Sequence, residues 1–313
     1  MKAGTMIERL ARVKVSSGWI TVVIGMTALG LGYAASAAIL PTPKIGVIHI
    51  DVVIDRSIQP YFTIPLAYAA EHRDVAAVVL LINSPGGGAA TSEELFYRVV
   101  ELRSQKPVVA SIDSLAASGA YYTAIGSNYI YAKPAAMVGS IGVRAGLPQP
   151  VPPDETSVLS GPFKGSGSSQ IDWIRGMDVI KETFVTNVYD QRLYVLEHMH
   201  EQSRADRLPD KDQLATGQVW IAPVAYDIGL IDALGSNLDA IQKAAELAQV
   251  TNYEVIDLTF LTLFGDPTYI GSALPPDLST LSFAHWSGDR QNADYLGSGP
   301  WPTFEHLYLP PTD

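Results

Sequence analysis

The sequence contains no cysteine, so disulfide bonds and thiolate chemistry are excluded. Charged residues are also few, at 17% of 313, and acidic residues outnumber basic ones by 32 to 21. The net charge of −11 argues against a nucleic-acid partner, because binding to phosphates needs a basic surface. No internal repeat is present, and the length suits one or two domains with a substantial core.

Charge is absent altogether from the 22 residues between Trp19 and Leu40, which are mostly apolar. A run of about 20 such residues is long enough to cross the hydrocarbon core of a bilayer. Basic residues outnumber acidic ones in the preceding segment, 1–18, which predicts that this segment stays in the cytoplasm. We therefore expect a transmembrane anchor at 19–40 that contacts the lipid bilayer, with the remaining chain on the extracytoplasmic side of the cell membrane.

Two other interpretations of this run stay open. The small residues of "AASAA" at 34–38 are compatible with signal-peptide cleavage, although the run exceeds the roughly 7–15 apolar residues usual in signal peptides. A buried core helix is the other interpretation, but the run lacks a polar face that would mark a solvent-exposed side.

Downstream, apolar runs alternate with helical patterns. This alternation is typical of parallel βαβ units with right-handed crossovers, and therefore of an α/β fold. Pro65 is expected in the first turn of its helix, and Thr91 and Glu94 are expected to form a capping box. The expected strands lie at 45–54, 75–82, 107–113 and 128–134, and the expected helices at 64–72, 91–105 and 116–126.

The second half of the chain is less regular. A proline-rich loop at 146–155 precedes a long expected helix at 176–206. A second helix is expected at 236–249, capped by Ser236 or Asn237. Residues 258–313 are rich in proline, glycine and aromatic residues without a period, so we expect an irregular C-terminal tail there.

The motif "INSPGGG" at 82–88 ends one of the buried strands. Glycines adopt backbone conformations closed to other residues and leave their N–H groups accessible to an approaching oxygen. Donors fixed in this way are what an oxyanion needs. An ordinary tight turn before a helix is the alternative interpretation of the motif.

The next strand ends in "SLAASGAYYTA" at 114–124, where Ser118 lies near the expected start of a helix. The small neighbours Ala117 and Gly119 leave the Ser118 hydroxyl uncrowded, and the helix dipole favours negative charge there. Both features suit a nucleophile, although a serine in this position is more often only a helix cap.

A serine nucleophile needs a base. None of the six histidines lies in a context that supports a Ser–His–Asp triad. His198 and His200 are two residues apart and so point to different helix faces, which argues against a metal site. A lysine serves as a base when it is desolvated enough to be neutral, and Lys164 in "SGPFKGSGSS" is a candidate because Pro162 and Phe163 offer apolar cover. Lys133 is the alternative.

Four motifs taken together resemble one family. In order they are "INSPGGG", "SIDSLAASGAYYTAIGSNYIYAKPAAMVGSIGV", "SGPFKGSGSS" and "LATGQVWIAPVAYDIGLIDALGS". The chain resembles the signal peptide peptidase A family, the S49 serine peptidases, over roughly residues 44–250. The resemblance implies a ClpP/crotonase-like α/β fold of stacked βαβ units with a parallel sheet, formed by a peptidase domain at 41–257 and preceded by the one N-terminal transmembrane helix.

The same resemblance implies roles for particular residues. Ser118 matches the nucleophile and Lys164 the general base of a Ser/Lys dyad. Gly86 and Gly87 match the oxyanion hole, with the N–H of Gly119 as a possible second donor. No cofactor is implied. The substrates would be peptides, namely signal-peptide remnants left in the membrane, and the chain would form a homo-oligomeric ring whose dyads are shared between adjacent subunits.

The chain departs from the family between Val143 and Lys164, where the segment is short and lacks an expected helix. Two alternatives to a peptidase therefore stay open. One is a catalytically inactive membrane scaffold of the same fold. The other is a crotonase-like acyl-CoA enzyme, since a glycine-rich oxyanion loop also suits thioesters.

Overall fold

The computed structural model describes residues 17–39, 41–150, 158–199 and 202–265. Most of them surround one sheet, in which the strand order is β6-β5-β3-β2-β1-β8, with β4 and then β7 branching from β3. All strand pairs are parallel except β5 with β6. The strands are β1 (Lys44–Ile50), β2 (Val75–Ser84), β3 (Val108–Ala117), β4 (Tyr129–Ala132), β5 (Met137–Gly139), β6 (Val219–Ile221), β7 (Ala233–Leu234) and β8 (Glu254–Asp257).

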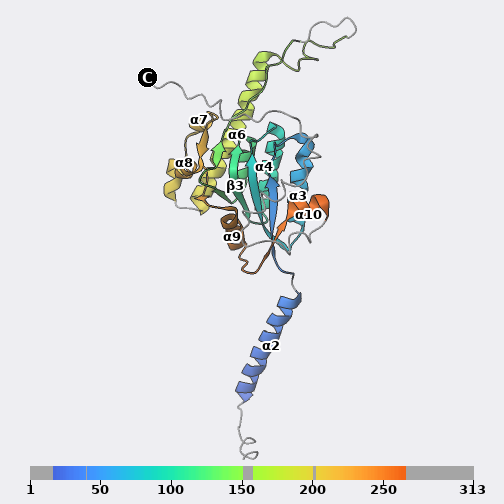
Figure 1. The fold of residues 1–313 in the computed structure, drawn as a ribbon, viewed down its shortest axis with the longest axis vertical. Coiled ribbons are helices and arrows are strands. Elements are labelled where there is room, and N and C mark those ends of the chain that lie inside the picture. Colours follow the sequence, from blue (N-terminus) through green and yellow to red (C-terminus); the bar gives the residue numbers. More distant parts are fainter. Residues whose placement is uncertain (1–16, 40, 151–157, 200–201, 266–313) are drawn as a thin grey trace, which may run out of the picture.

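Helices cover both faces of the sheet, and two apolar cores result (Figure 1). The larger core packs α3, α4, α5 and part of α6 against one face. The smaller core packs α9 against the other. The prediction of an α/β fold with a mostly parallel sheet is confirmed. The helices are α3 (Gln59–Glu71), α4 (Ala89–Arg103), α5 (Gly119–Ala124), α6 (Gln170–Met199), α7 (Lys211–Leu214), α8 (Ala222–Asp227), α9 (Asn237–Leu247) and α10 (Leu258–Phe264), with 3-10 turns η1 (Arg56–Ile58) and η2 (Gln202–Arg207).

Four helix starts differ from the sequence expectation. Helix α5 begins at Gly119 rather than at residue 116, because β3 continues to Ala117, and α6 begins at Gln170 rather than at residue 176. Helix α3 begins at Gln59, so Pro60 occupies its first turn and Pro65 lies inside the helix. Helix α4 begins at Ala89 after Gly88, and no side chain caps it. The expected capping box of Thr91 and Glu94 is therefore wrong, because the helix starts closer to the glycine run. Helix α9 is capped by Ser236, which forms a capping box with Asp239. Of the two expected caps, Ser236 and Asn237, the structure confirms Ser236.

The irregular tail begins later than expected. Helix α10 follows β8 directly, its N-terminus capped by Asp257 and its C-terminus ended by Gly265 in the left-handed conformation. Leu258 and Thr259 are buried, so this short helix belongs to the folded core. Residues 266–313 of the expected tail lie outside the described residues.

Helix α2 (Ser17–Ile39) lies apart from the sheet in Figure 1. Its described apolar side chains are exposed, and Trp19, Met26 and Leu29 each expose 68–75% of their surface. No helix in the described part of the chain is both long enough and apolar enough to cross a membrane. Residues 1–16 and Leu40 lie outside the described residues.

Candidate active site

Ser118 stands at the junction between β3 and α5, at the carboxyl end of a central parallel strand. Its backbone has φ 54° and ψ −124°, a left-handed conformation that residues other than glycine seldom adopt. Two hydrogen bonds hold it there: the Ser118 N–H donates to the Gly139 carbonyl (2.8 Å), and the Tyr122 N–H donates to the Ser118 carbonyl (2.9 Å). The surrounding structure thus imposes a strained conformation on this serine, as it does at many functional sites.

Gly86 lies directly against Ser118. Strands β2 and β3 are adjacent, and after a register shift between Ile82 and Ser84 their last pair is Ser84 with Ala116. The segments that follow them, the glycine loop and Ser118, therefore meet at one edge of the sheet. A Cβ on Gly86 would lie 2.6 Å from the Gly119 nitrogen and 2.9 Å from the Ser118 Cβ. Gly86 also has φ 89°. Only glycine fits at this position, because both the space and the conformation exclude a side chain.

The segment that follows β1 holds Gly87 in place through backbone hydrogen bonds to the residues on either side of it. The Ile54 N–H donates to the Gly86 carbonyl (2.9 Å), and the Gly88 N–H donates to the Ile54 carbonyl (2.8 Å). Because successive N–H groups of extended backbone point to opposite sides, the Gly87 N–H is turned away from Ile54. Among the described residues, neither this N–H nor that of Gly119 donates a hydrogen bond. Two such donors beside a serine form an arrangement that can bind an oxyanion.

A buried serine side chain supports this loop, and a second, half-buried serine follows β5, whose Gly139 carbonyl accepts the Ser118 N–H. The sequence did not single out either residue. The Ser84 hydroxyl donates to the Val52 carbonyl (2.6 Å) and accepts the Gly86 N–H (3.1 Å). Ser140 follows Gly139 and, like Ser118, has a positive φ, of 53°. The sequence offered only a weak indication of either residue. Ser84 ends an apolar strand before a Pro-Gly pair, and Ser140 follows a glycine.

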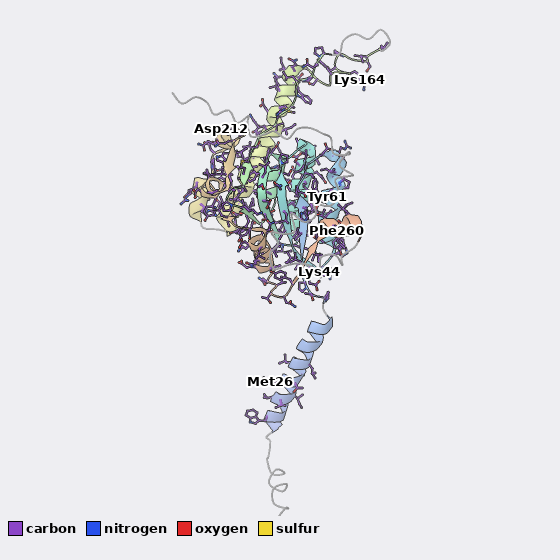
Figure 2. All side chains as sticks on the ribbon, in the orientation of Figure 1. Met26, Lys44, Tyr61, Lys164, Asp212 and Phe260 are labelled. Atoms are coloured by element: carbon purple, nitrogen blue, oxygen red, sulfur yellow. The ribbon has the colours of Figure 1, made fainter. Side chains whose placement is uncertain are left out.

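Lys164 lies elsewhere. It is exposed in the turn-rich segment before α6, and Figure 2 shows it beyond the outer end of that helix, away from the sheet. Pro162 is exposed and Phe163 exposes 48% of its surface, so the expected apolar cover is not formed within one chain. The structure of the single chain therefore brings together Ser118, Gly86, Gly87 and Gly119, but not Lys164.

Other basic side chains near the sheet are already engaged. Lys133 forms an ion pair with Asp113. Lys106 donates to the carbonyls of Ala69 and His72, and burial lowers its pKa, but it precedes β3 whereas Ser118 follows that strand. His49 pairs with Asp257 (Nε2–Oδ2 3.1 Å) on β1 and β8. In the described ranges, no cluster of three or more histidine or acidic side chains is arranged to hold a metal.

A buried ion pair joins α6 to the segment before β7, which also contacts α5. The Arg192 guanidinium of α6 makes two hydrogen bonds to the Asp232 carboxylate (2.6 and 3.1 Å), and both side chains are almost fully buried. Arg192 also donates to the Gly229 carbonyl (2.9 Å). The Tyr121 hydroxyl, three residues after Ser118, donates to the Leu230 carbonyl (2.7 Å) and thereby joins α5 to the same cluster.

Comparison with known proteins points to one family. The profile of Peptidase family S49 matches residues 100–149, a stretch that contains Ser118. Protease 4 of Haemophilus influenzae is 31% identical over 192 residues, which cover 58% of this chain and 30% of that protein. Protease 4 of Salmonella typhi is 30% identical over 236 residues, covering 69% and 38%. The resemblance to the S49 peptidases is confirmed.

The S49 similarity covers only part of the relatives. A chloroplastic serine protease SPPA of Arabidopsis thaliana is 29% identical over 199 residues, or 61% of this chain and 29% of that protein. The chain thus spans well under half the length of these three S49 relatives. Among solved structures, the 1510-N membrane-bound stomatin-specific protease in complex with a substrate peptide is 18% identical, with a TM-score of 0.48 over 69% of this chain and 92% of that one.

Proposed function

We propose that this protein is a membrane-anchored serine endopeptidase that cleaves signal-peptide remnants or other short hydrophobic peptides. The observation that carries the proposal is Ser118, strained at φ 54° and placed against Gly86, beside the N–H groups of Gly87 and Gly119, which have no hydrogen-bond partner among the described residues. The S49 similarity supports it, because the matched segment includes this serine. The ClpP/crotonase-like architecture expected from the family belongs to the same proposal.

In the proposed reaction, a peptide lies extended against the free side of the glycine loop. The Ser118 oxygen attacks the scissile carbonyl while a neutral lysine amine takes its proton. The N–H groups of Gly87 and Gly119 bind the resulting oxyanion. The lysine then protonates the leaving amine, and a water molecule, deprotonated by the same lysine, hydrolyses the acyl-enzyme.

Lys164 is the proposed base, and we propose that an adjacent subunit of a homo-oligomeric ring delivers it. The support is that Lys164 lies beyond the outer end of α6 and away from the sheet of its own chain (Figure 2). The segment 158–180, named here the arm, also exposes apolar side chains that a neighbouring subunit would cover. These include Val158, Phe163, Ile171, Ile174 and Val179, with 48–98% of their surface exposed.

The proposed substrates are apolar peptides. Val52 and Val53 expose 36% and 54% of their surface in the segment that Ser84 ties to the glycine loop. An apolar wall at that place favours hydrophobic side chains near the cleaved bond. A relative in Enterococcus faecium carries the name signal peptide peptidase SppA, at 28% identity over 203 residues, which agrees with substrates of this kind.

Helix α2 is the proposed anchor. Its exposed apolar side chains belong to the uncharged run that continues to Leu40 in the sequence. We place the N-terminus in the cytoplasm and the catalytic region on the extracytoplasmic side. Since the chain has no cysteine, single cysteines introduced by Thr5→Cys and by Glu101→Cys report this topology. A membrane-impermeant maleimide added to intact cells should label the second variant and spare the first; the reverse pattern would refute the orientation.

Complementation between inactive chains tests the shared dyad. Full-length Ser118→Ala and Lys164→Ala proteins should each fail to cleave a hydrophobic peptide. When the two are co-expressed, random mixing in a ring should place an intact serine beside a neighbour's intact lysine at about one quarter of sites. Peptidase activity should therefore return to about that fraction. If Lys164→Ala alone remains active, Lys164 is not the base.

A fluorophosphonate probe tests the nucleophile without a choice of substrate. The wild-type chain should be labelled at Ser118, as located by mass spectrometry, and the Ser118→Ala chain should not. Absence of labelling in the assembled wild-type protein would contradict the proposed peptidase and favour the inactive scaffold.

A further inference from the structure

Ser92 lies in α4, four residues after Gly88, and is almost completely buried, with 1% of its surface exposed. Its N–H donates to the Gly88 carbonyl (2.9 Å), which ties it to the end of the glycine loop. Its hydroxyl is buried and has no hydrogen-bond partner among the described residues. A buried hydroxyl in that state destabilises a fold, so its position needs an explanation.

The hydroxyl occupies the space beside Gly119. A Cβ on Gly119 would lie 2.0 Å from the Ser92 Oγ and 2.7 Å from the Ser92 Cβ. Gly119 is not among the glycines with positive φ, so its backbone conformation would permit a side chain. Ser92, rather than the conformation, is what excludes a side chain at position 119.

The same space adjoins the other oxyanion donor. The Gly87 nitrogen lies 3.4 Å from the point that a Cβ on Gly119 would occupy. The Ser92 Oγ and the Gly87 nitrogen therefore both lie within 3.4 Å of this one point beside Gly119. Gly87 comes from the loop after β2 and Gly119 from the start of α5, and β-strand pairing alone does not fix the separation of these two N–H groups.

We propose that Ser92 is a positioning residue for the oxyanion site: by filling the space between the two glycine backbones, its side chain fixes the separation of the Gly87 and Gly119 N–H groups. The inference rests on the proposed peptidase function. The Ser92 Oγ is buried and therefore does not contact the substrate. Ser92 acts on the transition state through the two donors, which bind the oxygen more tightly once it is negative.

The rate of Ser118 phosphonylation by a fluorophosphonate measures this role directly, since that reaction also develops charge on an oxygen near the donors. In the full-length assembled protein, Ser92→Ala should slow labelling by about 10- to 100-fold, as expected when donors move by a fraction of an ångström. With a peptide substrate, kcat should fall and KM should stay the same, because the donors act in the transition state.

Ser127→Ala is the matched control. Ser127 is also a fully buried serine whose hydroxyl has no partner in the described part of the chain, but it follows the far end of α5. This variant should be labelled within about twofold of the wild-type rate. The unfolding temperatures of the two variants show whether any difference reflects stability alone.

A compensating pair separates spacing from a general structural role. Ser92→Gly and Gly119→Ala should each slow labelling, the first by leaving a gap and the second by a clash. When the two substitutions are combined, the methyl group introduced by Gly119→Ala occupies the space vacated by the Ser92 side chain. The double variant should therefore react faster than either single variant. A double variant no faster than the faster of the two single variants would overturn the inference.

The remaining outcomes are also decisive. If Ser92→Ala is labelled at the wild-type rate, or if Ser127→Ala is slowed equally, the inference fails while the proposed peptidase stands. If the wild-type protein is not labelled at Ser118 at all, the proposed function fails, and the role of Ser92 fails with it.

Discussion

The two residues proposed to form the dyad lie in regions of opposite character. Ser118 belongs to the sheet, where β3 is flanked on both sides and the surrounding strands and helices are buried. Lys164 belongs to the arm, which is exposed and extends beyond the sheet along the outer part of α6 (Figure 2). Contacts within the chain fix the position of Ser118. The surroundings of Lys164 would become fixed only when a neighbouring subunit packs against the arm.

This difference separates two requirements of catalysis. The nucleophile and the oxyanion donors are positioned by contacts within one folded chain, so they should be present in a monomer. A lysine acts as a base only where water is largely excluded, and an exposed arm does not provide that. The comparison thus predicts that assembly, rather than folding, switches on the peptidase.

The largest expected effect comes from the base. Lys164→Ala should reduce peptide cleavage by about 10³-fold or more without changing the unfolding temperature, since general-base catalysis is lost and no packed side chain is removed. Lys181→Ala is the control, because Lys181 is a partly exposed lysine of α6 just beyond the arm and forms an ion pair with Asp178 (3.5 Å). Equal losses in the two variants would mean that positive charge in this part of the chain, and not the base, matters.

Next in size is Gly86→Ala, which affects the folded region. The new methyl group would meet the Gly119 nitrogen and the Ala117 oxygen at 2.6 Å, and φ 89° disfavours alanine. We expect loss of labelling at Ser118 together with a decrease of about 2–4 kcal/mol in the free energy of unfolding. Gly161→Ala on the arm, where nothing lies within 4 Å of the new methyl group, should leave the unfolding free energy unchanged.

Breaking the Arg192–Asp232 pair should show how α6 is fixed to the sheet. Asp232→Ala leaves the Arg192 guanidinium buried without its counter-ion, which should lower the unfolding free energy by about 3–5 kcal/mol. Asp178→Ala removes the exposed pair on the same helix and should change it by less than about 0.5 kcal/mol. Denaturant titrations of both variants measure the difference, and similar values would contradict the rigid attachment of α6.

The smallest effect concerns His49. Burial by itself would lower its pKa, but the hydrogen bond to Asp257 and the charges of Asp257 and Asp51 raise the pKa above 6.5 overall. A raised pKa in the folded state contributes stability that is complete below the unfolded-state pKa and is lost as the pH rises through the folded-state pKa. The same carboxylates, with burial as the larger cause, raise the pKa of Tyr61 to about 12, so this tyrosine stays neutral throughout.

Unfolding measured at pH 6 and pH 8 tests this linkage. The wild-type protein should lose more unfolding free energy between these pH values than His49→Asn does. Labelling of Ser118 should be affected equally in both proteins, because His49 lies on β1 and is not part of the glycine loop. An identical pH dependence of unfolding would show that His49 carries no linked proton.

Local patterns predicted the folded region well. The apolar run at 75–82 is β2 of the sheet, and the Ser236 cap appears in α9. The closeness of the glycine loop and Ser118 follows from strand order, since adjacent parallel strands end at the same edge. The start of α4 was missed because Gly88 begins the helix without a capping side chain, which leaves no local signal.

The features that depend on distant contacts were not predictable. Helix α10 is short, and Leu258 is buried only because α3 and β1 lie beside it. The role proposed for Ser92 could not be predicted from the sequence, because it depends on the closeness of Ser92 to Gly119, which belongs to a different helix. The surroundings of Lys164 were expected from its immediate neighbours Pro162 and Phe163, yet Pro162 is exposed and Phe163 exposes 48% of its surface, so these neighbours do not cover the lysine within the chain.

The bridge between Ile54 and Gly87 has a consequence for selectivity. The protein's own backbone already satisfies one side of the glycine loop, so an incoming polypeptide has access to the opposite side alone. A strand within a folded protein has its backbone groups bonded to its neighbours and cannot offer a free edge there. Discrimination between intact proteins and loose fragments would then follow from backbone hydrogen bonding, before any side chain is recognised.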